Sequence, residues 1–322
     1  MERVVDMDNL RESFLLAAKG KSNRTEVVAF RESLDAELLR LRCELAEGTY
    51  RFGHYRRFTV YDPKEREICA APFRDRVTFH AMMRVCHAVF ERFQMNVSYA
   101  SRVGMGTYKA IEQAQRYSRS YRWFLKMDVC KYFDSVEHGC MKRQLHSLFK
   151  DEQLLRYFDT LIDTYHSETG RGLPIGNLTS QYFANHYLAV ADHYAKERLG
   201  AKAMVRYMDD VVLWGNDKEE LLCMAYRYRT YLEQELLLNL HPFCVNKTCH
   251  GMPFLGYVVY PHSLRLNQRS RRRYRRNVAA LDEMTDSGAM SQADALQRIT
   301  SMLSFVNKSR AGSFLRTVRI AK

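Results

Sequence analysis

The sequence has little proline, with six in 322 residues, at positions 63, 72, 174, 242, 253 and 261. Two stretches, 1–62 and 73–173, contain none, and both can be mostly helical because proline is the residue that most strongly interrupts a helix. Apolar runs are short, and none approaches the roughly 18 residues of a membrane helix. The N-terminal MERVVDMDNL carries acids where a signal peptide carries basic and then apolar residues. We therefore expect a cytoplasmic protein without a membrane segment.

The eight cysteines form no C-x-x-C pair and no regular framework. They are expected to be reduced thiols in a reducing compartment. One group, His241, Cys244, Cys249 and His250, has residue types that ligate metals, but its spacing matches no zinc signature. Whether this group binds a metal is left open by the sequence.

Acidic residues are in the minority, with 37 against 50 basic residues and a formal net charge of +13. Residues 261–322 hold 13 basic and four acidic side chains, a net charge of +9. Such a concentration favours a polyanionic partner, for example nucleic acid. The hydrophobic content of 46% is enough for a core and excludes intrinsic disorder.

Two periodicities alternate along the chain. Amphipathic spacing predicts helices over residues 31–46, 75–93 and 181–199, and Gly48 is expected to end the first of them. Short segments rich in Val, Tyr, Phe and Trp predict strands at 57–61, 123–127, 203–207, 211–214 and 254–260. Helices mixed with short, partly antiparallel strands indicate an α+β fold.

Three carboxylates follow or separate apolar strands. Asp209 and Asp210 lie in AMVRYMDDVVLWG, where a hairpin would turn, and Asp128 directly follows the apolar WFLKM. Acids at the ends of buried strands repel one another and lose solvation, and a divalent cation compensates for both effects. Three such carboxylates can hold two Mg²⁺ ions about 3.5–4 Å apart, the arrangement that serves phosphoryl transfer.

Around these acids the sequence resembles the palm motifs of reverse transcriptases. MDVCKYFDSV, GLPIGNLTSQYFAN and Y-M-D-D occur in the family's order and spacing, and the resemblance extends from about residue 50 to about 265. In place of the commoner Q-G-x-x-x-S-P, this chain has I-G-x-x-x-S-Q, which is similar to the reverse transcriptases of diversity-generating retroelements.

The resemblance implies a right-hand polymerase with fingers and palm, an antiparallel palm sheet flanked by helices, and a short helical thumb. The expected division is an N-terminal helical extension (1–55), a fingers and palm domain (56–260) and a basic helical thumb (261–322). The segment FLGYVV, residues 254–259, resembles the primer-grip hairpin.

The resemblance also implies a metal site. Its expected catalytic residues are Asp128, Asp209 and Asp210, and the carbonyl of Val129 completes the coordination of two Mg²⁺ ions, which Mn²⁺ could replace.

Nucleotide contacts are implied for a larger set: Lys64, Arg66, Arg76, Phe133, Ile175, Gly176, Gln181 and Lys247. Arg66 is the first choice for the triphosphate, whereas Arg76, beside Asp75, could equally form a structural salt bridge. Phe133, five residues after Asp128, falls at the family's steric gate, where a bulky ring excludes a 2′-hydroxyl and favours deoxynucleotides.

Six arginines begin an expected C-terminal helix: Arg269, Arg271, Arg272, Arg273, Arg275 and Arg276. A solvated charged helix face is the usual interpretation of such a run. Because related enzymes carry a thumb here that tracks the template-primer backbone, we favour sequence-independent phosphate contacts.

The implied function is an RNA-directed DNA polymerase that makes error-prone, adenine-mutagenic cDNA. Its partners would be a structured template RNA, the RNA-cDNA duplex, dNTPs and an accessory variability protein, a basic oligomer. A retron-like or phage-defence reverse transcriptase is the alternative within enzymes. A catalytically silent nucleic-acid-binding scaffold is a third possibility, which the presence of all three acids disfavours. Since neither an RNase H acid set nor an HNH pattern is seen, we expect copying of RNA without cleavage.

Overall fold

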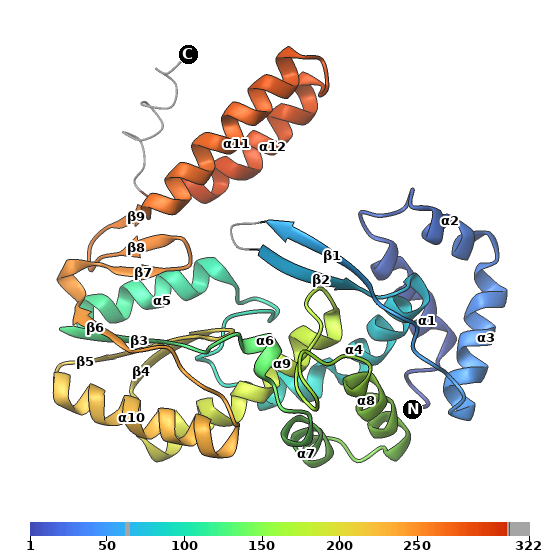
Figure 1. Ribbon diagram of the computed structural model, residues 1–322, viewed down its shortest axis with the longest axis horizontal. Coiled ribbons are helices and arrows are strands. Elements are labelled where there is room, and N and C mark those ends of the chain that lie inside the picture. Colours follow the sequence, from blue (N-terminus) through green and yellow to red (C-terminus); the bar gives the residue numbers. More distant parts are fainter. Residues whose placement is uncertain (62–64, 308, 310–322) are drawn as a thin grey trace.

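The structure is a computed structural model that describes residues 1–61, 65–307 and 309 (Figure 1). Lys64, one of the residues expected to bind nucleotide, lies outside the described residues. None of the described helices is long and apolar enough to cross a membrane.

Three N-terminal helices pack together and against the long fourth helix: α1 (Met7–Ala18), α2 (Thr25–Glu32), α3 (Leu34–Glu47) and α4 (Phe73–Phe93). The rings of Phe14, Phe30 and Phe73 contact one another at centroid distances of 5.3–5.9 Å and join α1, α2 and α4. The helix expected over residues 31–46 begins later than predicted because Ser33 separates α2 from α3. Its predicted end at Gly48 is confirmed, since this glycine has a φ of 77° and closes the helix in the left-handed conformation.

An antiparallel hairpin follows the N-terminal helices. It consists of β1 (Arg56–Tyr61) and β2 (Glu65–Ala70). β1 was predicted from its composition, whereas β2, half of whose residues are charged, was not.

The central sheet has four antiparallel strands in the order β4-β5-β3-β6, with bounds Ala203–Tyr207, Asp210–Gly215, Trp123–Asp128 and Cys244–Lys247. Helix α10 (Lys218–Glu235) covers one face and α5 (Thr107–Ser120) the other (Figure 1). Successive residues of a strand point to opposite faces. Accordingly, Leu125 lies in the core that includes α10, and Phe124 in the core that includes α5.

Four more helices complete the larger part of the fold: α6 (Tyr132–Ser135), α7 (His138–Leu148), α8 (Glu152–Asp163) and α9 (Leu178–His193). A π-helical turn, Tyr194–Arg198, continues α9, so this helix and its extension cover all but the last residue of the predicted range of 181–199.

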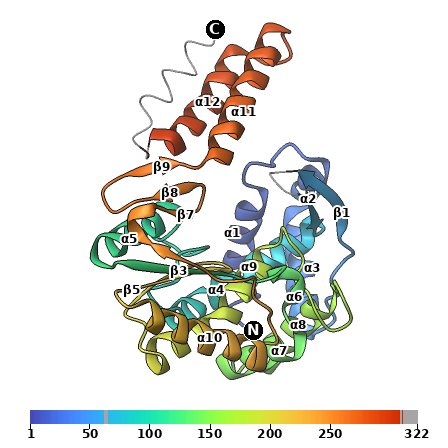
Figure 2. The same ribbon diagram turned by 60° about the vertical axis from the view of Figure 1, so that its left-hand side comes forward.

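The C-terminal part begins with a 3₁₀ turn (Thr248–His250) and a three-stranded sheet of β7 (Met252–Phe254), β8 (Tyr257–Val259) and β9 (Leu264–Leu266). The single strand predicted over 254–260 is wrong, because Leu255 and Gly256, with φ of 47° and 88°, form a turn inside it. Helices α11 (Gln268–Asp286) and α12 (Gln292–Asn307) then project from β9 as a helical hairpin (Figure 2).

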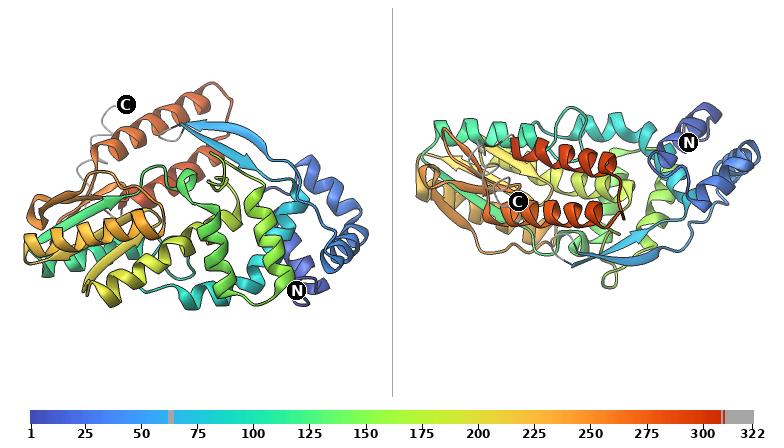
Figure 3. Two further views of the ribbon diagram at one scale, coloured as in Figure 1. Left: turned by 60° about the horizontal axis from the view of Figure 1, so that its bottom comes forward. Right: turned by 90° about the horizontal axis from the view of Figure 1, so that it is seen from above.

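Two hydrophobic cores hold these elements. The larger core includes Leu10 of α1 and Leu38 of α3 together with side chains of α4, α7 to α10 and one face of the central sheet. The smaller core lies between the other sheet face, α5, the strands β7 to β9 and the helical hairpin. Figure 3 shows from two sides that α1 to α3 lie at the opposite end of the molecule from β7 to β9. The expected α+β class is confirmed.

Candidate active site

The pairing of strands brings the three predicted carboxylates to one end of the central sheet. Asp128, the last residue of β3, lies opposite Asp210, the first residue of β5. Tyr207 of β4 also pairs with Asp210, which leaves Met208 and Asp209 as a two-residue loop. Met208 has a φ of 54°, and a positive φ at the first central residue is typical of two-residue hairpins. The hairpin predicted from the sequence is confirmed.

A lysine that the sequence analysis missed lies among these acids. Lys126 is two residues before Asp128 and therefore on the same face of β3. Its Nζ is 2.9 Å from Oδ2 of Asp210 and donates a hydrogen bond of 3.2 Å to the carbonyl of Pro253 in β7. The spacing K-x-D in a strand could have indicated a shared face, but only the pairing with β5 shows that the partner is Asp210.

Burial and mutual repulsion raise the pKa of two carboxyl groups. Burial raises the pKa of Asp210 to about 6, with a further contribution from Asp128 and Asp209 and an opposing one from Lys126. Burial and the charge of Asp128 also raise the pKa of Asp209, against the charges of Arg66 and Lys126. The site therefore concentrates negative charge that its own cations only partly offset, which is the electrostatic situation that a bound divalent cation relieves.

The donor chemistry of these residues fits a hard divalent cation. All candidate ligands are oxygens, as Mg²⁺ prefers, and Oδ1 of Asp210 is buried without a hydrogen-bond partner in the described part of the chain. Val129 and Leu240 form an isolated backbone bridge, in which the carbonyls of Asp128 and Asn239 accept the hydrogen bonds. The carbonyl of Val129 is not used in this bridge. No three His, Cys, Asp or Glu side chains form a ready-made metal cluster within the described residues, and Asp210 is paired with Lys126.

Three of the residues predicted to contact nucleotide lie in strand β2 or against it. Arg66 of β2 lies close enough to Asp209 to lower its pKa. The carbonyl of Ile175 accepts a hydrogen bond of 2.8 Å from the N–H of Cys69 in the same strand. Gly176 has a φ of 114°, and a Cβ there would lie 2.9 Å from Cγ2 of Ile68. Glycine is therefore required both by the backbone conformation and by the close approach of β2.

Phe133 and Gln181 are two further residues that were predicted to contact nucleotide. Phe133, in α6, is half-buried, and its carbonyl accepts a hydrogen bond of 2.7 Å from the N–H of Leu173, at the start of the loop that carries Ile175. Gln181 is exposed in the first turn of α9, where its Oε1 accepts a hydrogen bond from Ser101.

Two predicted nucleotide contacts lie elsewhere. Arg76 forms an ion pair with Glu26 of α2, which agrees with the structural alternative for this residue. Lys247 pairs with Trp123, at the far end of β3, and its Nζ lies 5.6 Å from the centre of the Trp123 ring. At a rise of about 3.3 Å per residue, that end is about 16 Å from Asp128. The register of β6 on β3 therefore places Lys247, which was expected to contact nucleotide, at the end of β3 that is away from the carboxylates.

The remaining groups are on the surface. Arg269, Arg271, Arg272, Arg275 and Arg276 are exposed along α11, and Arg273 is half-exposed. His241, Cys244, Cys249 and His250 are also exposed, and His250 contacts Asn246. Within the described residues, these four side chains do not form a group that could hold a metal ion.

Comparison with known proteins gives relatives over about half of the chain. Escherichia coli protein YkfC is 28% identical over 186 residues, which cover 53% of this chain and 48% of YkfC. The Lactococcus lactis group II intron-encoded protein LtrA is 25% identical over 159 residues, 47% of this chain and 26% of LtrA. The chain thus spans less than half of the length of these relatives.

Solved structures with the same fold include telomerases at 10–11% identity. Apo telomerase from Candida tropicalis has a TM-score of 0.54 over 67% of this chain and 48% of its own. Candida albicans telomerase has a TM-score of 0.53 over 85% of this chain and 60% of its own. The profile of the family described as "Reverse transcriptase (RNA-dependent DNA polymerase)" matches residues 63–259. Because this match covers more than half of the chain and includes all three carboxylates, the chain belongs to the reverse transcriptase family.

Proposed function

We propose that this protein is an RNA-directed DNA polymerase whose reaction takes place at Asp128, Asp209 and Asp210. The observation that carries the proposal is the strand register, which sets Asp128 opposite Asp210 and places Asp209 in the adjoining turn. Family membership supports it, since the matched segment contains all three acids.

The proposed metal ligands are the three carboxylates and the carbonyl of Val129, with Mg²⁺ as the ion and Mn²⁺ as a possible substitute. Two bound divalent cations supply activation of the attacking oxygen and stabilisation of the leaving one. Lys126 neutralises Asp210 in the present arrangement. Asp210 must exchange this partner when it becomes a ligand, and the lysine then remains near the site as a positive charge.

The substrates proposed are dNTPs, a template RNA and the growing RNA-cDNA duplex. Arg66 of β2 contributes a cation for the triphosphate, Phe133 the ring beside the sugar, and Ile175, Gly176 and Gln181 the surface on which the nucleotide pairs. The exposed arginines of α11 supply a basic face for the duplex backbone, which carries one charge per phosphate.

Within reverse transcriptases, we assign the chain to the diversity-generating retroelement group. The residues I-G-x-x-x-S-Q at 175–181 support this assignment. Error-prone copying, with errors at template adenine, and an accessory variability protein, a basic oligomer, belong to the same proposal. DNA that flanks the gene is the direct test: a template repeat and a variable repeat are expected, and a toxin or defence gene in their place would favour the retron-like or phage-defence alternative.

The experiment that tests the catalytic proposal is primer extension on an RNA template with dNTPs and Mg²⁺, comparing wild type with Asp209→Asn. Synthesis is expected to fall more than about tenfold while RNA binding is kept, because the change removes a metal-binding charge and preserves the side-chain shape. Asp35→Asn is the matched control, since Asp35 is an exposed aspartate whose partner is Arg11 of α1. Residual activity of Asp209→Asn above about a tenth of wild type would reject the assignment.

A further inference from the structure

An arginine is completely buried beneath the carboxylate hairpin. Arg206, in β4, has 0% exposure, and so has its partner Asp192 in α9. Nε of Arg206 is 2.8 Å from both carboxylate oxygens of Asp192, and Nη2 is 2.6 Å from Oδ2. A buried ion pair is commonly no more stabilising than apolar side chains of the same volume, because the desolvation of both charges opposes their attraction. Stability alone therefore does not account for this charge in the core.

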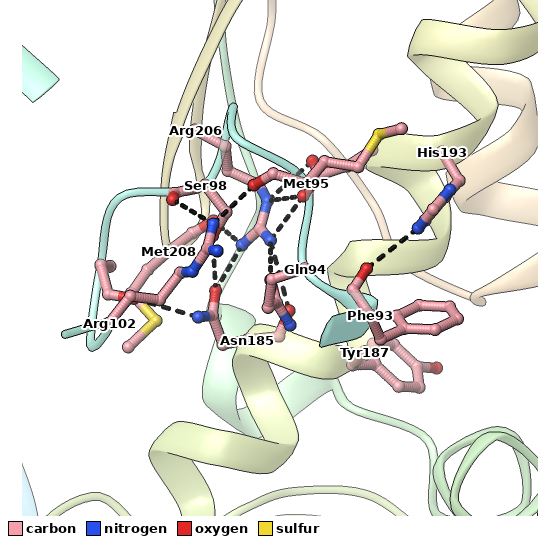
Figure 4. A network of polar contacts seen from close by, with 12 residues as sticks. Phe93, Gln94, Met95, Ser98, Arg102, Asn185, Tyr187, His193, Arg206 and Met208 are labelled. Carbon is pink, nitrogen blue, oxygen red and sulfur yellow. Dashed lines mark hydrogen bonds and ion pairs between the residues drawn. The ribbon is translucent and has the colours of Figure 1, made fainter. Parts of the chain in front are cut away.

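The guanidinium reaches the turn that carries Asp209. Its Nη1 donates hydrogen bonds to the carbonyl of Met208 at 3.2 Å and to Oδ1 of Asn185 at 2.9 Å (Figure 4). Its Nη2 also donates to Gln94 and to the carbonyl of Asn185, each at 3.3 Å. Each nitrogen of the planar guanidinium group thus donates to an acceptor, and these hydrogen bonds fix the orientation of the group.

The backbone of Arg206 is held as firmly as its side chain. Its N–H donates to the carbonyl of Val97 at 2.7 Å, and its carbonyl accepts from the N–H of Tyr99 at 2.9 Å. Ser98 and Ala100 of the same segment hydrogen-bond to the carboxamide of Asn185. The segment 97–100 therefore holds the backbone of Arg206 and the carboxamide of Asn185, which in turn accepts a hydrogen bond from the Arg206 side chain.

The turn needs such support. Met208 has a φ of 54°, a left-handed conformation that a non-glycine residue adopts at a cost of about 1 kcal/mol or more. Asp209 follows directly, so the direction of its carboxylate depends on the conformation that Met208 keeps. The hydrogen bond from Arg206 is made to the carbonyl between these two residues.

We infer that Arg206 is a positioning residue of the active site. It acts through the carbonyl of Met208, holds the Met208-Asp209 turn in its left-handed conformation and so directs the Asp209 carboxylate toward the metal site shared with Asp128. The inference rests on the proposed role of Asp209 as a metal ligand.

The test substitutes Arg206→Lys, which keeps a positive charge opposite Asp192 but cannot span Asp192 and Met208 with one planar fork. Mn²⁺ affinity is measured without nucleotide, from the free-ion signal in electron paramagnetic resonance. Because groups that orient metal ligands typically contribute about 10- to 100-fold, we expect affinity and kcat each to fall about tenfold or more. The KM for dNTP and the Kd for RNA are expected to stay within about twofold.

Arg102→Lys is the matched control. Arg102 is another arginine whose side chain is little exposed, at 5%, and its hydrogen bonds within the described chain go to Glu91 and to the carbonyls of Met95 and Ser98. We expect it to lower the melting temperature by a comparable amount and to leave Mn²⁺ affinity unchanged. Equal Mn²⁺ affinity and kcat in the two variants would overturn the inference and leave Arg206 a purely structural residue.

If Arg206→Lys does not fold, Asn185→Ser is the alternative test of the inference. It removes the Oδ1 acceptor of Nη1 and leaves the ion pair between Arg206 and Asp192 in place. A smaller loss of Mn²⁺ affinity in the same direction is expected, and an unchanged affinity contradicts the inference. Asp209→Asn separates the two proposals: if it keeps wild-type Mn²⁺ affinity, the metal assignment fails; if it loses affinity while Arg206→Lys does not, only the role of Arg206 fails.

Discussion

At the residue scale, the burial of Asp210 opposes the ionisation of its carboxyl group. Its pKa is raised to about 6 from an ordinary value near 4, so the folded protein holds this proton more tightly than the unfolded chain does. Stability from this group is therefore full below about pH 4 and is lost as pH rises from about 4 to about 6, by on the order of 2–3 kcal/mol. Divalent cations bind the ionised form and should recover this loss near neutral pH.

Asp210→Asn is expected to be more stable than wild type at pH 7 in the absence of divalent cations, although its DNA synthesis should be strongly reduced. The amide stays neutral at every pH, so the variant escapes the cost of ionising a buried group. Chemical denaturation at pH 4.5 and 7 in the presence of a chelator measures the difference. An identical pH dependence in the two proteins would contradict the raised pKa.

Phe133→Ala is predicted to raise ribonucleotide incorporation relative to deoxynucleotide by about ten- to a hundredfold, since the truncation opens space for a 2′-hydroxyl. Phe133→Tyr keeps the ring and should keep the selectivity of wild type. Primer extension with competing dNTP and rNTP measures the ratio. Unchanged selectivity in a folded alanine variant would show that the gate lies elsewhere.

Ile175 and Gln181 are where this chain departs from the commoner motif. Isoleucine cannot hydrogen-bond to the sugar of the incoming nucleotide, and losing one such bond costs on the order of 1 kcal/mol of discrimination, which is about fivefold. We predict that Ile175→Gln, alone or with Gln181→Pro, lowers misincorporation opposite template adenine more than opposite other bases.

The backbone at Ile175 should tolerate this change, because its carbonyl is held by Cys69 whatever the side chain. Ile175→Val, which adds no donor, is the control. Sequencing of cDNA copied from a mixed-base template gives the error rate at each base. An error rate at template adenine equal to that of wild type, in an active double variant, would contradict the prediction.

At the scale of elements, α11 presents five exposed arginines to solvent. Neutralising Arg271, Arg272, Arg273 and Arg275 is predicted to weaken RNA-DNA binding irrespective of sequence. Each arginine that no longer neutralises a phosphate should reduce the slope of log affinity against log salt by about one, because fewer counterions are released. Titrations at several salt concentrations measure the slope.

The control for α11 removes four exposed charges near α8, α9 and α10, elements that lie across the molecule from α11 in Figure 1: Lys150, Arg156, Arg198 and Arg227. Both variants lower the net charge of +13 by four. A salt slope that falls equally in the two would mean that overall charge, and not α11, governs binding. An unaltered salt slope in the α11 variant would mean that these arginines form an ordinary solvated helix face and do not contact phosphates.

At the scale of the whole molecule, the N-terminal helices are part of the larger core. Leu10, Phe14, Leu38, Leu41 and Leu45 are all buried there. Burial of each side chain of this size contributes about 1.5–3 kcal/mol. The sum over the five side chains is comparable to the whole free energy of unfolding of a typical protein, which is roughly 5–15 kcal/mol.

Deletion of residues 1–55 is therefore predicted to abolish cooperative unfolding, whereas a chain that ends at residue 266 keeps the larger core whole and should retain it. Thermal melts followed by circular dichroism compare the two truncations. Cooperative melting without residues 1–55 would show that this segment is an independent extension.

Sequence alone determined the elements whose signals are local. The helix ending at Gly48, the strand before Asp128 and the turn at Met208 and Asp209 follow from apolar periodicity and turn chemistry within a few residues. The three carboxylates were found the same way, because acids next to apolar strands stand out within one short segment. The strand expected over 254–260 failed because Leu255 adopts a left-handed conformation that local propensity does not favour.

Only the tertiary structure decided which distant residues meet. Lys126 neutralises Asp210 and Arg206 supports Met208 because of strand register and the packing of α9, whereas Lys247, though expected at the site, pairs with Trp123 instead. The physical reason is that pairing between strands and the burial of a charge depend on contacts between segments far apart in the chain, and a one-residue change of register would turn each side chain to the other face of the sheet.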